Sequence, residues 1–402
     1  MSTSGKKICV VGLGYIGLPT ASLLGTKGYQ VHGVDVSEKV VETINNGGIH
    51  IVEPDLDILV KSAVQAGNLV ASQQPAEADI FIIAVPTPFS DSKQPDLTYV
   101  ENATRSICPY VKPGNLVILE STSPIGTTDE IVASILQKNG HDVGNDVFVA
   151  HCPERVLPGR ILVELVENDR VVGGINDAST QIAVAFYEEF VRGDVLPTTA
   201  KTAEMVKLTE NSFRDVNIAF ANEISMIAES EGINTWEVIA LANRHPRVNI
   251  LQPGPGVGGH CIAVDPWFIV HRSPEYARLI RTAREVNDHK PQWVLERVRE
   301  KAAKFKKPVI GCLGLAFKAD VDDLRESPAM DIVRELQREN IGELLVCEPN
   351  LISHPEFKLQ KLEEVIKKAD IVLLLVDHKP FRKITASNLK EKIVIDTRGI
   401  FH

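Results

Sequence analysis

The sequence Gly12-Leu13-Gly14-Tyr15-Ile16-Gly17 is a glycine-rich turn between a β-branched run, Ile8–Val11, and a segment of helical composition. A second strand-like run, Gln30–Val34, ends at Asp35, eighteen residues beyond the last glycine. In a strand–turn–helix–strand unit, such glycines allow a tight turn and the close approach of a pyrophosphate, and the acid binds the adenosine ribose. The pattern therefore predicts a dinucleotide site, with a merely structural turn as the alternative. Because a carboxylate repels a 2′-phosphate, Asp35 favours NAD over NADP.

Strand-like and helix-like segments alternate over most of the chain. In the first half, further buried-strand candidates follow plausible helices at Ile80–Val85, Leu116–Leu119 and Val147–Ala150. After Lys307 the alternation resumes, with strand candidates at Pro308–Leu313, Leu344–Cys347, Ile371–Val376 and Lys392–Asp396, and helix candidates at Ala329–Arg338 and Leu362–Lys368. Such alternation is typical of parallel sheets covered by helices. We predict an α/β protein with two Rossmann-like, doubly wound domains.

A long helix is predicted between the two α/β regions. The segment Ala203–Glu231 contains neither Gly nor Pro, and an apolar stripe recurs in it at steps of three and four: Phe213, Val216, Phe220, Ile224 and Ile227. At about 100° per residue, Lys207, Asn211 and Arg214 fall roughly opposite this stripe. We expect the stripe to pack and the opposite face to offer polar groups, with a merely solvated face as the alternative. The predicted domains are 1–198, 199–302 and 303–402, and the middle one is a helical connector.

Composition and charge restrict the classes of function. The chain has 402 residues, of which 44% are hydrophobic and 24% charged, and its formal net charge is −10. This charge argues against nucleic-acid or anionic-membrane binding. The longest apolar runs are far shorter than the ~20 residues of a membrane-spanning helix. The polar start, Met1–Lys7, carries no secretory signal, so we expect a cytoplasmic protein whose six cysteines are reduced thiols.

A second glycine-rich segment, Gly254–Pro266, carries a cysteine. Its four glycines within six residues expose backbone N–H groups and let a ligand approach closely. Cys261 ends the loop and Asp265 follows, which suits a nucleophilic thiolate. The alternative is a small buried thiol in a packed turn. We expect no metal, because adjacent residues such as His151-Cys152 and His260-Cys261 rarely face one ion together, and no CxxC or HxxxH spacing is present.

Basic residues gather in the loops of this acidic chain. They are Arg155, Arg244, Arg247, Lys318 and Arg325. Arginine and lysine in such places favour the clamping of phosphate groups, which predicts an anionic ligand held by local basic pockets.

Together these motifs resemble those of the nucleotide-sugar 6-dehydrogenases, the UDP-glucose and GDP-mannose dehydrogenase group. The resemblance runs from Gly12 to about Gly399, and its further markers are Val85-Pro86-Thr87-Pro88, Glu120-Ser121-Thr122, Pro153-Glu154, Lys207 with Asn211, Gly258-Gly259-His260-Cys261 with Asp265, and Phe317-Lys318. The stretches His50–Leu56 and Asn243–Pro253 are similar to the branch that acts on UDP-N-acetyl-D-mannosamine. Where the UDP-glucose branch has a second carboxylate, this chain has Pro158.

The resemblance implies a four-electron, NAD-dependent oxidation of the sugar C6 hydroxyl to a carboxylate, for a surface polysaccharide precursor. Cys261 would attack the intermediate aldehyde, and the thiohemiacetal would lose a second hydride to become a thioester that water hydrolyses. Lys207 would transfer protons and stabilise the oxyanion beside Asn211, while Asp265 and Glu154 would position or activate water. The implied contacts with the UDP-sugar are Arg155, Val156, Lys207, Asn211, Arg214, His245, Arg247, Gly258, Phe317 and Lys318. Those with NAD are Gly12, Gly14, Tyr15, Ile16, Gly17, Asp35, Thr87, Thr122 and Arg325.

The resemblance also implies a homodimer formed through the central helix, with the loop at His245–Arg247 reaching the neighbouring subunit. The apolar stripe suits that interface and equally suits an intrachain core. Three rival hypotheses stay open: UDP-N-acetylglucosamine or a related UDP-hexosamine as substrate, a two-electron dehydrogenase in which Cys261 is structural, and a non-catalytic nucleotide-sugar or NAD sensor. The last is disfavoured because a binding protein has no need of Lys207, Asn211, Cys261 and Asp265 together.

Overall fold

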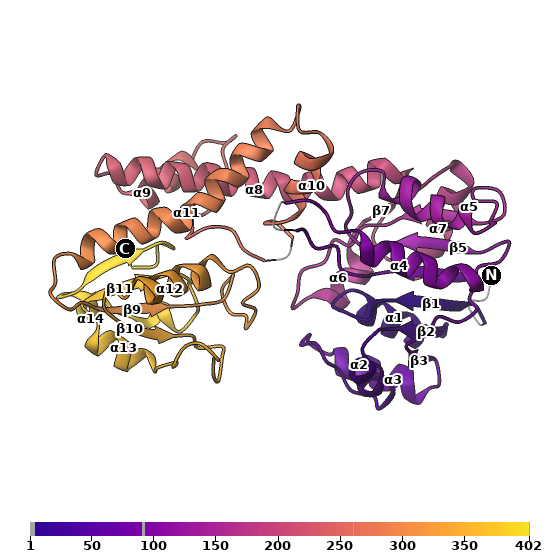
Figure 1. The fold of residues 1–402 in the computed structure, drawn as a ribbon, viewed down its shortest axis with the longest axis horizontal. Helices are drawn as coiled ribbons and strands as arrows, with labels where there is room; N and C mark the ends of the chain where they lie inside the picture. Colours follow the sequence, from indigo (N-terminus) through magenta and orange to yellow (C-terminus); the bar gives the residue numbers. More distant parts are fainter. Residues whose placement is uncertain (1–4, 91–92, 260, 402) are drawn as a thin grey trace. The chain divides into compact units, whose positions relative to one another are not determined.

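The computed structural model describes residues 5–90, 93–259 and 261–401, so that His260 lies outside the described residues. Contacts divide the chain into two compact units, and the boundary between Glu210 and Asn211 falls inside one long helix, α8 (Ala200–Ser230; Figure 1). Each unit holds its own sheet. The prediction of two Rossmann-like α/β domains joined by a long helix is therefore confirmed, while the domain limits at 198 and 302 stay a prediction.

The first unit is built around an eight-stranded sheet in the order β3-β2-β1-β4-β5-β6-β7-β8. Its strands are β1 (Lys7–Val11), β2 (Gln30–Val34), β3 (Leu69–Ser72), β4 (Ile80–Ile83), β5 (Leu116–Leu119), β6 (Phe148–His151), β7 (Arg170–Gly174) and β8 (Val195–Thr199). Neighbouring strands are parallel, except that β6 and β7 pair antiparallel. The strand order reverses between β1 and β4. In open α/β sheets, ligands bind beyond the carboxyl ends of the strands at this point.

Helices cover both faces of this sheet, as alternate residues of β1 show. Ile8 and Val10 belong to an apolar cluster with α1, α3, α6 and α7, whereas Cys9 and Val11 belong to a second cluster with α4 and α5. The helices are α1 (Gly17–Thr26), α2 (Glu38–Asn45), α3 (Leu56–Gln65), α4 (Thr98–Ile107), α5 (Ser134–Lys138), α6 (Ile161–Glu167) and α7 (Asp177–Glu188), and a π-helical turn, Thr128–Ala133, precedes α5. Burial on both faces explains why these strands read as continuous apolar runs.

The second unit contains a four-stranded parallel sheet in the order β10-β9-β11-β12. Its strands are β9 (Val309–Leu313), β10 (Glu343–Cys347), β11 (Ile371–Leu374) and β12 (Ile393–Asp396). Its helices are α9 (Thr235–Ala242), α10 (Asp265–Arg272), α11 (Arg278–Ala302), α12 (Pro328–Glu339), α13 (Leu362–Lys368) and α14 (Ala386–Leu389). The strand order again reverses beside the first strand, β9, which places a second potential ligand site at the carboxyl ends of β9 and β11.

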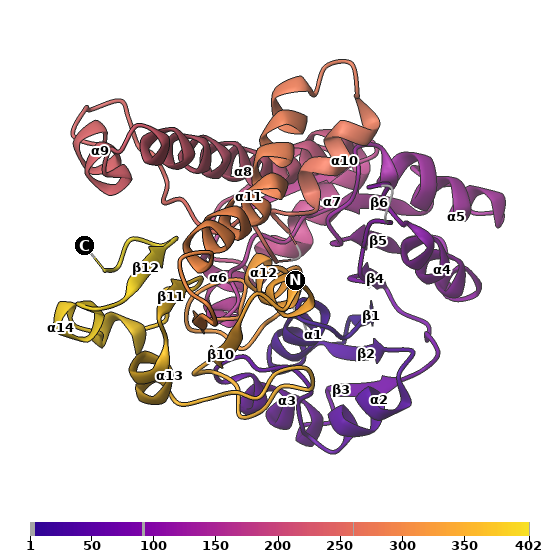
Figure 2. The same ribbon diagram turned by 60° about the vertical axis from the view of Figure 1, so that its left-hand side comes forward.

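The apolar stripe of α8 does not form an intrachain core. Phe213, Phe220 and Ile227 are 68%, 51% and 51% exposed. The buried positions of α8 instead include polar residues, among them Asp215 and Asn222, which face α11. Figure 2 shows α9 beside the carboxyl-terminal end of α8. Of the two partners considered for the stripe, the structure disfavours an intrachain core, because α11 covers the polar face of α8 instead, and an interface with a second chain stays a prediction. In the described part of the chain, no helix is both long and apolar enough to cross a membrane.

Candidate functional site

The glycine-rich turn after β1 needs glycine for steric reasons. Gly12 has a φ of +94°, and a Cβ there would lie 2.5 Å from the carbonyl oxygen of Ala84. A Cβ at Gly17 would lie 1.8 Å from the carbonyl oxygen of Gly12, so the first turn of α1 packs directly on the loop. A Cβ at Gly14 would meet nothing within 4 Å, and the open space beside it suits the approach of a ligand. The loop therefore fits a pyrophosphate cradled at a helix N-terminus.

Asp35 lies at the carboxyl end of β2, directly beside this loop. Its Oδ2 accepts a hydrogen bond from the backbone N–H of Leu13 at 3.2 Å, and its Oδ1 accepts one from the N–H of Ser37 at 2.9 Å. Two backbone donors thus orient the carboxylate toward the turn. Tyr15, in the same turn, is 37% exposed. The structure therefore brings together the glycines and the acid that the sequence predicts for dinucleotide binding.

The loops after β4 and β5 are joined at the same edge of the sheet. Thr87 Oγ1 donates a hydrogen bond to the carbonyl oxygen of Thr122 at 2.6 Å, and Ser121 Oγ donates to that of Val85 at 2.7 Å. The first loop follows β4, which lies next to β1 in the sheet, and the second follows β5, the next strand beyond β4. The predicted cofactor residues Thr87 and Thr122 therefore lie at the point where the strand order reverses.

Glu154, in the loop after β6, is a buried carboxylate with two partners. Its Oε2 accepts a hydrogen bond from Arg170 Nη1 at 3.1 Å, and its Oε1 accepts one from the backbone N–H of Arg155 at 2.7 Å. The Arg170 side chain is 2% exposed. A second buried acid, Glu120, accepts a hydrogen bond from Tyr187, and burial raises its pKa to about 7. Arg170 and Tyr187 were not predicted as site residues. The sequence offers one clue to Arg170, a charged residue that directly precedes the apolar residues of β7.

Arg155 is held within the first unit by acceptors of its own. Its Nη2 pairs with Glu210 Oε1 at 2.8 Å, and its Nη1 donates to the carbonyl oxygen of Asp169 at 3.0 Å. Val156 beside it packs against the apolar cluster of α1 and α6. An anion that binds Arg155 must therefore compete with Glu210. Arg214, His245 and Arg247 are exposed, and the hydrogen bond from Arg247 N to His245 Nδ1 stays within one turn.

In the second unit, Asn211 and Asp265 meet although 54 residues separate them in sequence. Asn211 Nδ2 donates a hydrogen bond to Asp265 Oδ2 at 2.6 Å, and the residues are only 7% and 4% exposed. Asp265 is the first residue of α10, and its backbone N–H donates to the carbonyl oxygen of Cys261 at 2.8 Å. Lys207 precedes Asn211 by four residues, about one turn of α8. The buried amide–carboxylate pair thus links α8 to the turn that carries Cys261.

Cys261 differs from the other cysteines of the chain in its exposure. Cys9, Cys108, Cys152, Cys312 and Cys347 are buried, whereas Cys261 is exposed. Burial raises the pKa of Cys9 to about 11 and that of Cys312 to about 12, so that these thiols stay protonated at neutral pH. The interpretation of Cys261 as a small buried thiol is therefore wrong, and it is the accessible candidate for a nucleophile.

A polar network holds the start of the loop before Cys261. The backbone N–H of Gly254 donates to Asn222 Oδ1 at 2.9 Å, and Asn222 Nδ2 donates to Asn287 Oδ1 at 2.8 Å. Asn287 in turn donates to Asp215 Oδ1, which also pairs with Arg284 Nη1 at 2.6 Å. Asn222 and Asp215 are fully buried. Because the backbone N–H of Gly254 is bound by a side chain of α8 that is itself bound by α11, these two helices together determine where the loop begins.

The loop then packs against the segment that carries Phe317. A Cβ at Gly258 would lie 2.2 Å from the carbonyl oxygen of Glu326, and one at Gly259 would lie 2.9 Å from the Phe317 ring. The backbone N–H of Gly259 donates to the carbonyl oxygen of Arg325 at 3.3 Å. Of the predicted residues, Gly258, Phe317 and Arg325 therefore lie together in the second unit.

Lys290 of α11 is buried in the helix pair that supports this loop. Its Nζ donates to Ser225 Oγ at 2.6 Å and lies 4.0 Å from the centroid of the Trp293 ring. Burial lowers its pKa to about 7, and Glu229 only partly offsets this effect. The charged form of this lysine is therefore destabilised in the folded protein at neutral pH.

Lys290→Met is expected to remove a pH-dependent part of the stability. Between about pH 7 and pH 10 the unfolded chain binds the extra proton on Lys290, so the free energy of unfolding of the wild type rises with pH by up to about 1.4 kcal/mol per unit. The variant lacks this contribution. Urea denaturation at pH 7, 8 and 9 therefore yields a wild-type-minus-variant difference that grows with pH. A constant difference would contradict the lowered pKa.

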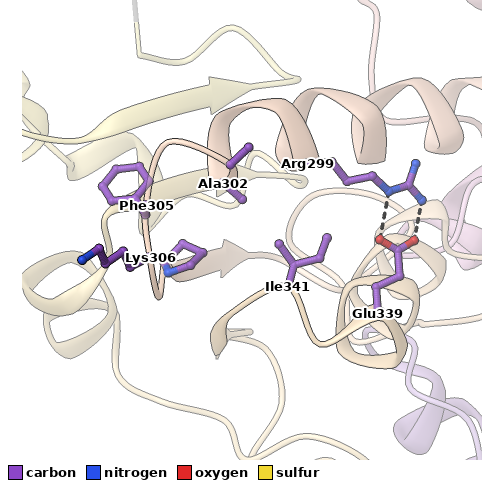
Figure 3. A pocket seen from close by; sticks show the side chains of 8 residues that line it. Arg299, Ala302, Phe305, Lys306, Glu339 and Ile341 are labelled. Atoms are coloured by element: carbon purple, nitrogen blue, oxygen red, sulfur yellow. Dashed lines mark hydrogen bonds and ion pairs between the residues drawn. The ribbon is translucent and has the colours of Figure 1, made fainter.

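An open pocket of about 540 Å³ lies at the opposite edge of the small sheet. Its lining comes from the end of α11, the connection to β9 and the end of α12 (Figure 3). Arg299 Nε donates to Glu339 Oε2 at 2.9 Å on one wall, with a second bond from the same guanidinium, and Phe305 and Ile341 add apolar surface. The pocket lies at the amino ends of β9 and β10, so it is separate from the edge that carries the predicted site. Within the described ranges, no three His, Cys, Asp or Glu side chains form a metal-binding group.

Comparisons with known proteins agree over nearly the whole chain. Three family models match it: the NAD binding domain (6–191), the central domain (201–289) and the UDP binding domain (311–402) of the UDP-glucose/GDP-mannose dehydrogenase family. The chain is 57% identical to an NDP-N-acetyl-D-galactosaminuronic acid dehydrogenase of Ralstonia solanacearum, covering 98% of this chain and 96% of the relative. It is 53% identical to the UDP-N-acetyl-D-mannosamine dehydrogenase of Escherichia coli K12, covering 98% and 99%.

A solved structure agrees with the sequence relatives. The UDP-N-acetyl-mannosamine dehydrogenase Cap5O from S. aureus superposes with a TM-score of 0.91 at 42% identity, covering 98% of this chain and 95% of that chain. This similarity extends over both units, so the fold is shared over nearly the whole chain.

Proposed function

Since the chain belongs to the UDP-glucose/GDP-mannose dehydrogenase family and is an NAD-dependent oxidoreductase, we propose that it oxidises C6 of UDP-N-acetyl-D-mannosamine to the carboxylate. The observation that carries this proposal is the buried hydrogen bond between Asn211 and Asp265. Asp265 follows the exposed Cys261 by four residues, and its backbone N–H donates to the carbonyl oxygen of Cys261. A binding protein gains nothing from placing an exposed thiol beside a buried carboxylate and amide. A thiol-dependent oxidation of an aldehyde requires such groups.

The oxidation of an alcohol to a carboxylate removes four electrons, and bound NAD supplies the hydride acceptor, twice per substrate. Cys261 adds its sulfur to the carbonyl carbon of the aldehyde formed first. The thiohemiacetal that results donates hydride more readily than the aldehyde, and its oxidation leaves a thioester. Water cleaves the carbon–sulfur bond, which releases the acid and restores the thiol.

The remaining polar residues act on protons and charge. Lys207 accepts the proton of the C6 hydroxyl and stabilises the oxyanion, and Asn211 donates a hydrogen bond in the same place. Asp265 accepts from Asn211, which fixes the orientation of the amide, and Asp265 is our candidate for orienting water. Glu154 is fully engaged by Arg170 and the Arg155 backbone, so we assign it an electrostatic and positioning role rather than that of a free base.

The experiment that tests this function measures NADH released per sugar consumed, with UDP-N-acetylmannosamine, UDP-N-acetylglucosamine, UDP-N-acetylgalactosamine and UDP-glucose compared side by side. We expect two NADH with the mannosamine sugar. Two NADH with the galactosamine sugar alone would identify that sugar as the substrate instead. It is the second candidate because the chain is 57% identical to the Ralstonia relative. One NADH per sugar would leave only a two-electron oxidation, and no NADH with any sugar would overturn the proposal.

The position of Asp35 predicts the cofactor preference. Asp35→Ala is expected to lower the ratio of kcat/KM for NAD to that for NADP by about tenfold or more, because a hydrogen bond to a charged group contributes about 1.5–3 kcal/mol. The ratio, rather than kcat/KM for NAD alone, is the quantity to measure, because Asp35 also accepts from the Leu13 and Ser37 backbone. An unchanged ratio would show that Asp35 is not the ribose ligand.

The exposed apolar stripe supports a homodimer. Three large side chains on one helix face, Phe213, Phe220 and Ile227, are each at least half exposed in the single chain, and an exposed apolar patch is typical of a protein interface. We expect light scattering to give twice the 44.1 kDa of one chain. The double variant Phe213→Glu, Phe220→Glu is expected to shift the mass toward the monomer, whereas Glu223→Gln on the same helix leaves it unchanged. A wild-type mass of one chain at every concentration would contradict the dimer.

A further inference from the structure

The segment that carries Phe317 and Lys318 begins at the carboxyl end of β9, the strand between β10 and β11. The segments that follow β10 and β11 begin at the same edge and supply two buried side chains, Glu348 and His378. Both side chains have no exposed surface. Neither residue belongs to the set that the sequence predicts, and both lie beneath the predicted substrate segment.

Glu348 binds the beginning of this segment. Its Oε2 accepts hydrogen bonds from the backbone N–H groups of Leu315 at 2.7 Å and Ala316 at 3.1 Å. The same oxygen faces His378 Nε2 at 3.0 Å, and Oε1 accepts from the backbone N–H of Asn350 at 3.0 Å. Burial alone would raise the pKa of Glu348, but the hydrogen bonds from His378 and these backbone donors lower it. The carboxylate is therefore charged and orders four donors around it.

His378 binds the end of the same segment. Its Nδ1 accepts a hydrogen bond from the backbone N–H of Asp320 at 2.9 Å, and the Asn350 amide nitrogen lies 2.9 Å from the same atom. An Nδ1 that accepts carries no proton, so the proton lies on Nε2 and is donated to Glu348. In return, the backbone N–H of Lys379 donates to Asp320 Oδ1 at 3.0 Å. Asp320 has a φ of +60°, a left-handed conformation that these two bonds stabilise.

Phe317 and Lys318 lie between these two attachments. On its other side, Phe317 contacts the glycine loop, because added Cβ atoms at Gly258 and Gly259 would lie 3.0 Å and 2.9 Å from its side chain. The conformation of the short segment 315–320 therefore depends on a buried pair beneath it and on the Cys261 loop beside it. A buried polar network of this kind costs desolvation and is compensated only when every member is satisfied.

We propose that Glu348 and His378 are positioning residues for the uridine diphosphate part of the substrate, acting through the backbone of segment 315–320, which holds Phe317 and Lys318 in their binding conformation. This inference rests on the proposed function, because it takes Phe317 and Lys318 as substrate contacts. Glu348 and His378 do not themselves touch the ligand. All four hydrogen-bonding atoms of the pair are engaged within the protein.

Two substitutions of His378 separate positioning from mere packing. In His378→Asn the side-chain oxygen can take the place of Nδ1 and accept from Asp320, whereas in His378→Gln the amide reaches the place of Nε2 and leaves the Asp320 N–H without its acceptor. We expect calorimetry with UDP as the probe to show a Kd about tenfold higher for the Gln variant, and a smaller increase for the Asn variant. Asn350→Ala removes another contact of the same Nδ1 and is expected to leave the Kd within about twofold.

The readouts distinguish the possible failures. If the wild type does not bind UDP, the proposed function is wrong. If the wild type binds UDP and the folded Gln variant binds it equally well, the positioning role is overturned while the proposed function stands. If the Gln variant does not fold, Glu348→Gln takes its place, since the amide has the shape of the carboxylate but its nitrogen donates and cannot accept from the donors around Glu348. Weaker UDP binding with an unchanged KM for NAD supports the role, and unchanged UDP binding overturns it.

Discussion

Cys261→Ala is expected to abolish formation of the carboxylate product, with turnover lower by about 10³-fold or more, while UDP still binds. The variant lacks the sulfur that converts an aldehyde into a good hydride donor. The change leaves the fold unaltered, because Cys261 is exposed and its backbone oxygen still accepts from Asp265. On one preparation, mass spectrometry measures the carboxylate product, NADH release per sugar measures the electrons removed, and calorimetry measures the binding of UDP.

The matched control for this variant is Cys347→Ala. Cys347 is buried at the end of β10, so its truncation leaves a small cavity and lowers stability without removing an accessible thiol. We expect it to lower the melting temperature and to retain most of the turnover. Full formation of the acid by the Cys261→Ala variant would eliminate the covalent mechanism. Release of one NADH by both the variant and the wild type would favour the two-electron rival.

Asn211→Asp is expected to be the second most damaging change, lowering kcat at neutral pH by about 10²-fold or more. It places a second carboxylate where Asn211 Nδ2 now lies 2.6 Å from Asp265 Oδ2, in a site that is almost fully buried. Two carboxylates at this distance repel each other when both are ionised, which raises the pKa of one of them, so the protonated form gains population as the pH falls. When both carboxylates are ionised, Lys207 lies one turn from a charged side chain instead of a neutral one, and Asp265 has lost the hydrogen bond that Asn211 Nδ2 donates to it.

The pH dependence of this variant identifies the cause of its loss. A protonated carboxyl donates a hydrogen bond much as the amide does, so the ratio of variant to wild-type kcat is expected to rise as the pH falls from 8 to 6. Asn211→Leu, of similar volume, cannot donate at any pH and serves as the control, with a ratio that does not change with pH. A pH-independent ratio for Asn211→Asp would show that the pair with Asp265 is not what the reaction needs.

The sequence predicted all four strands of the small sheet and five of the eight strands of the large sheet. The runs at Ile80–Val85 and Ile371–Val376 could be predicted as strands because strands buried on both faces consist of consecutive apolar residues. The structure adds β3, β7 and β8, which were not predicted. β8 contains Pro197 and is largely exposed at one edge, β3 alternates buried and exposed residues at the other, and β7 ends in two glycines. These patterns resemble loops unless their partners are known.

The candidate site likewise has one part that the sequence predicts and another that only the structure shows. The glycines of residues 12–17 and Asp35 were predictable because one local unit contains the strand, the turn and the acid. The same holds for Cys261 as a candidate, since its glycine loop is contiguous. Whether that thiol is accessible, and whether the apolar stripe of α8 is covered, depended on contacts between distant segments. Periodicity identified the stripe as one face of the helix, but it could not decide between an intrachain core and an interface as the partner of that face.

From its residues alone, this chain is a two-sheet α/β protein with a dinucleotide turn, a long helix and a glycine loop ending in cysteine, because each of these is a short-range pattern. The structure was needed for the pairs Asn211–Asp265, Glu154–Arg170 and Glu348–His378, whose members lie 54, 16 and 30 residues apart. Buried polar groups choose partners by satisfying hydrogen bonds in three dimensions, and no spacing along the chain encodes that choice. Folding therefore sets the orientation of the site, whereas local sequence sets its chemistry.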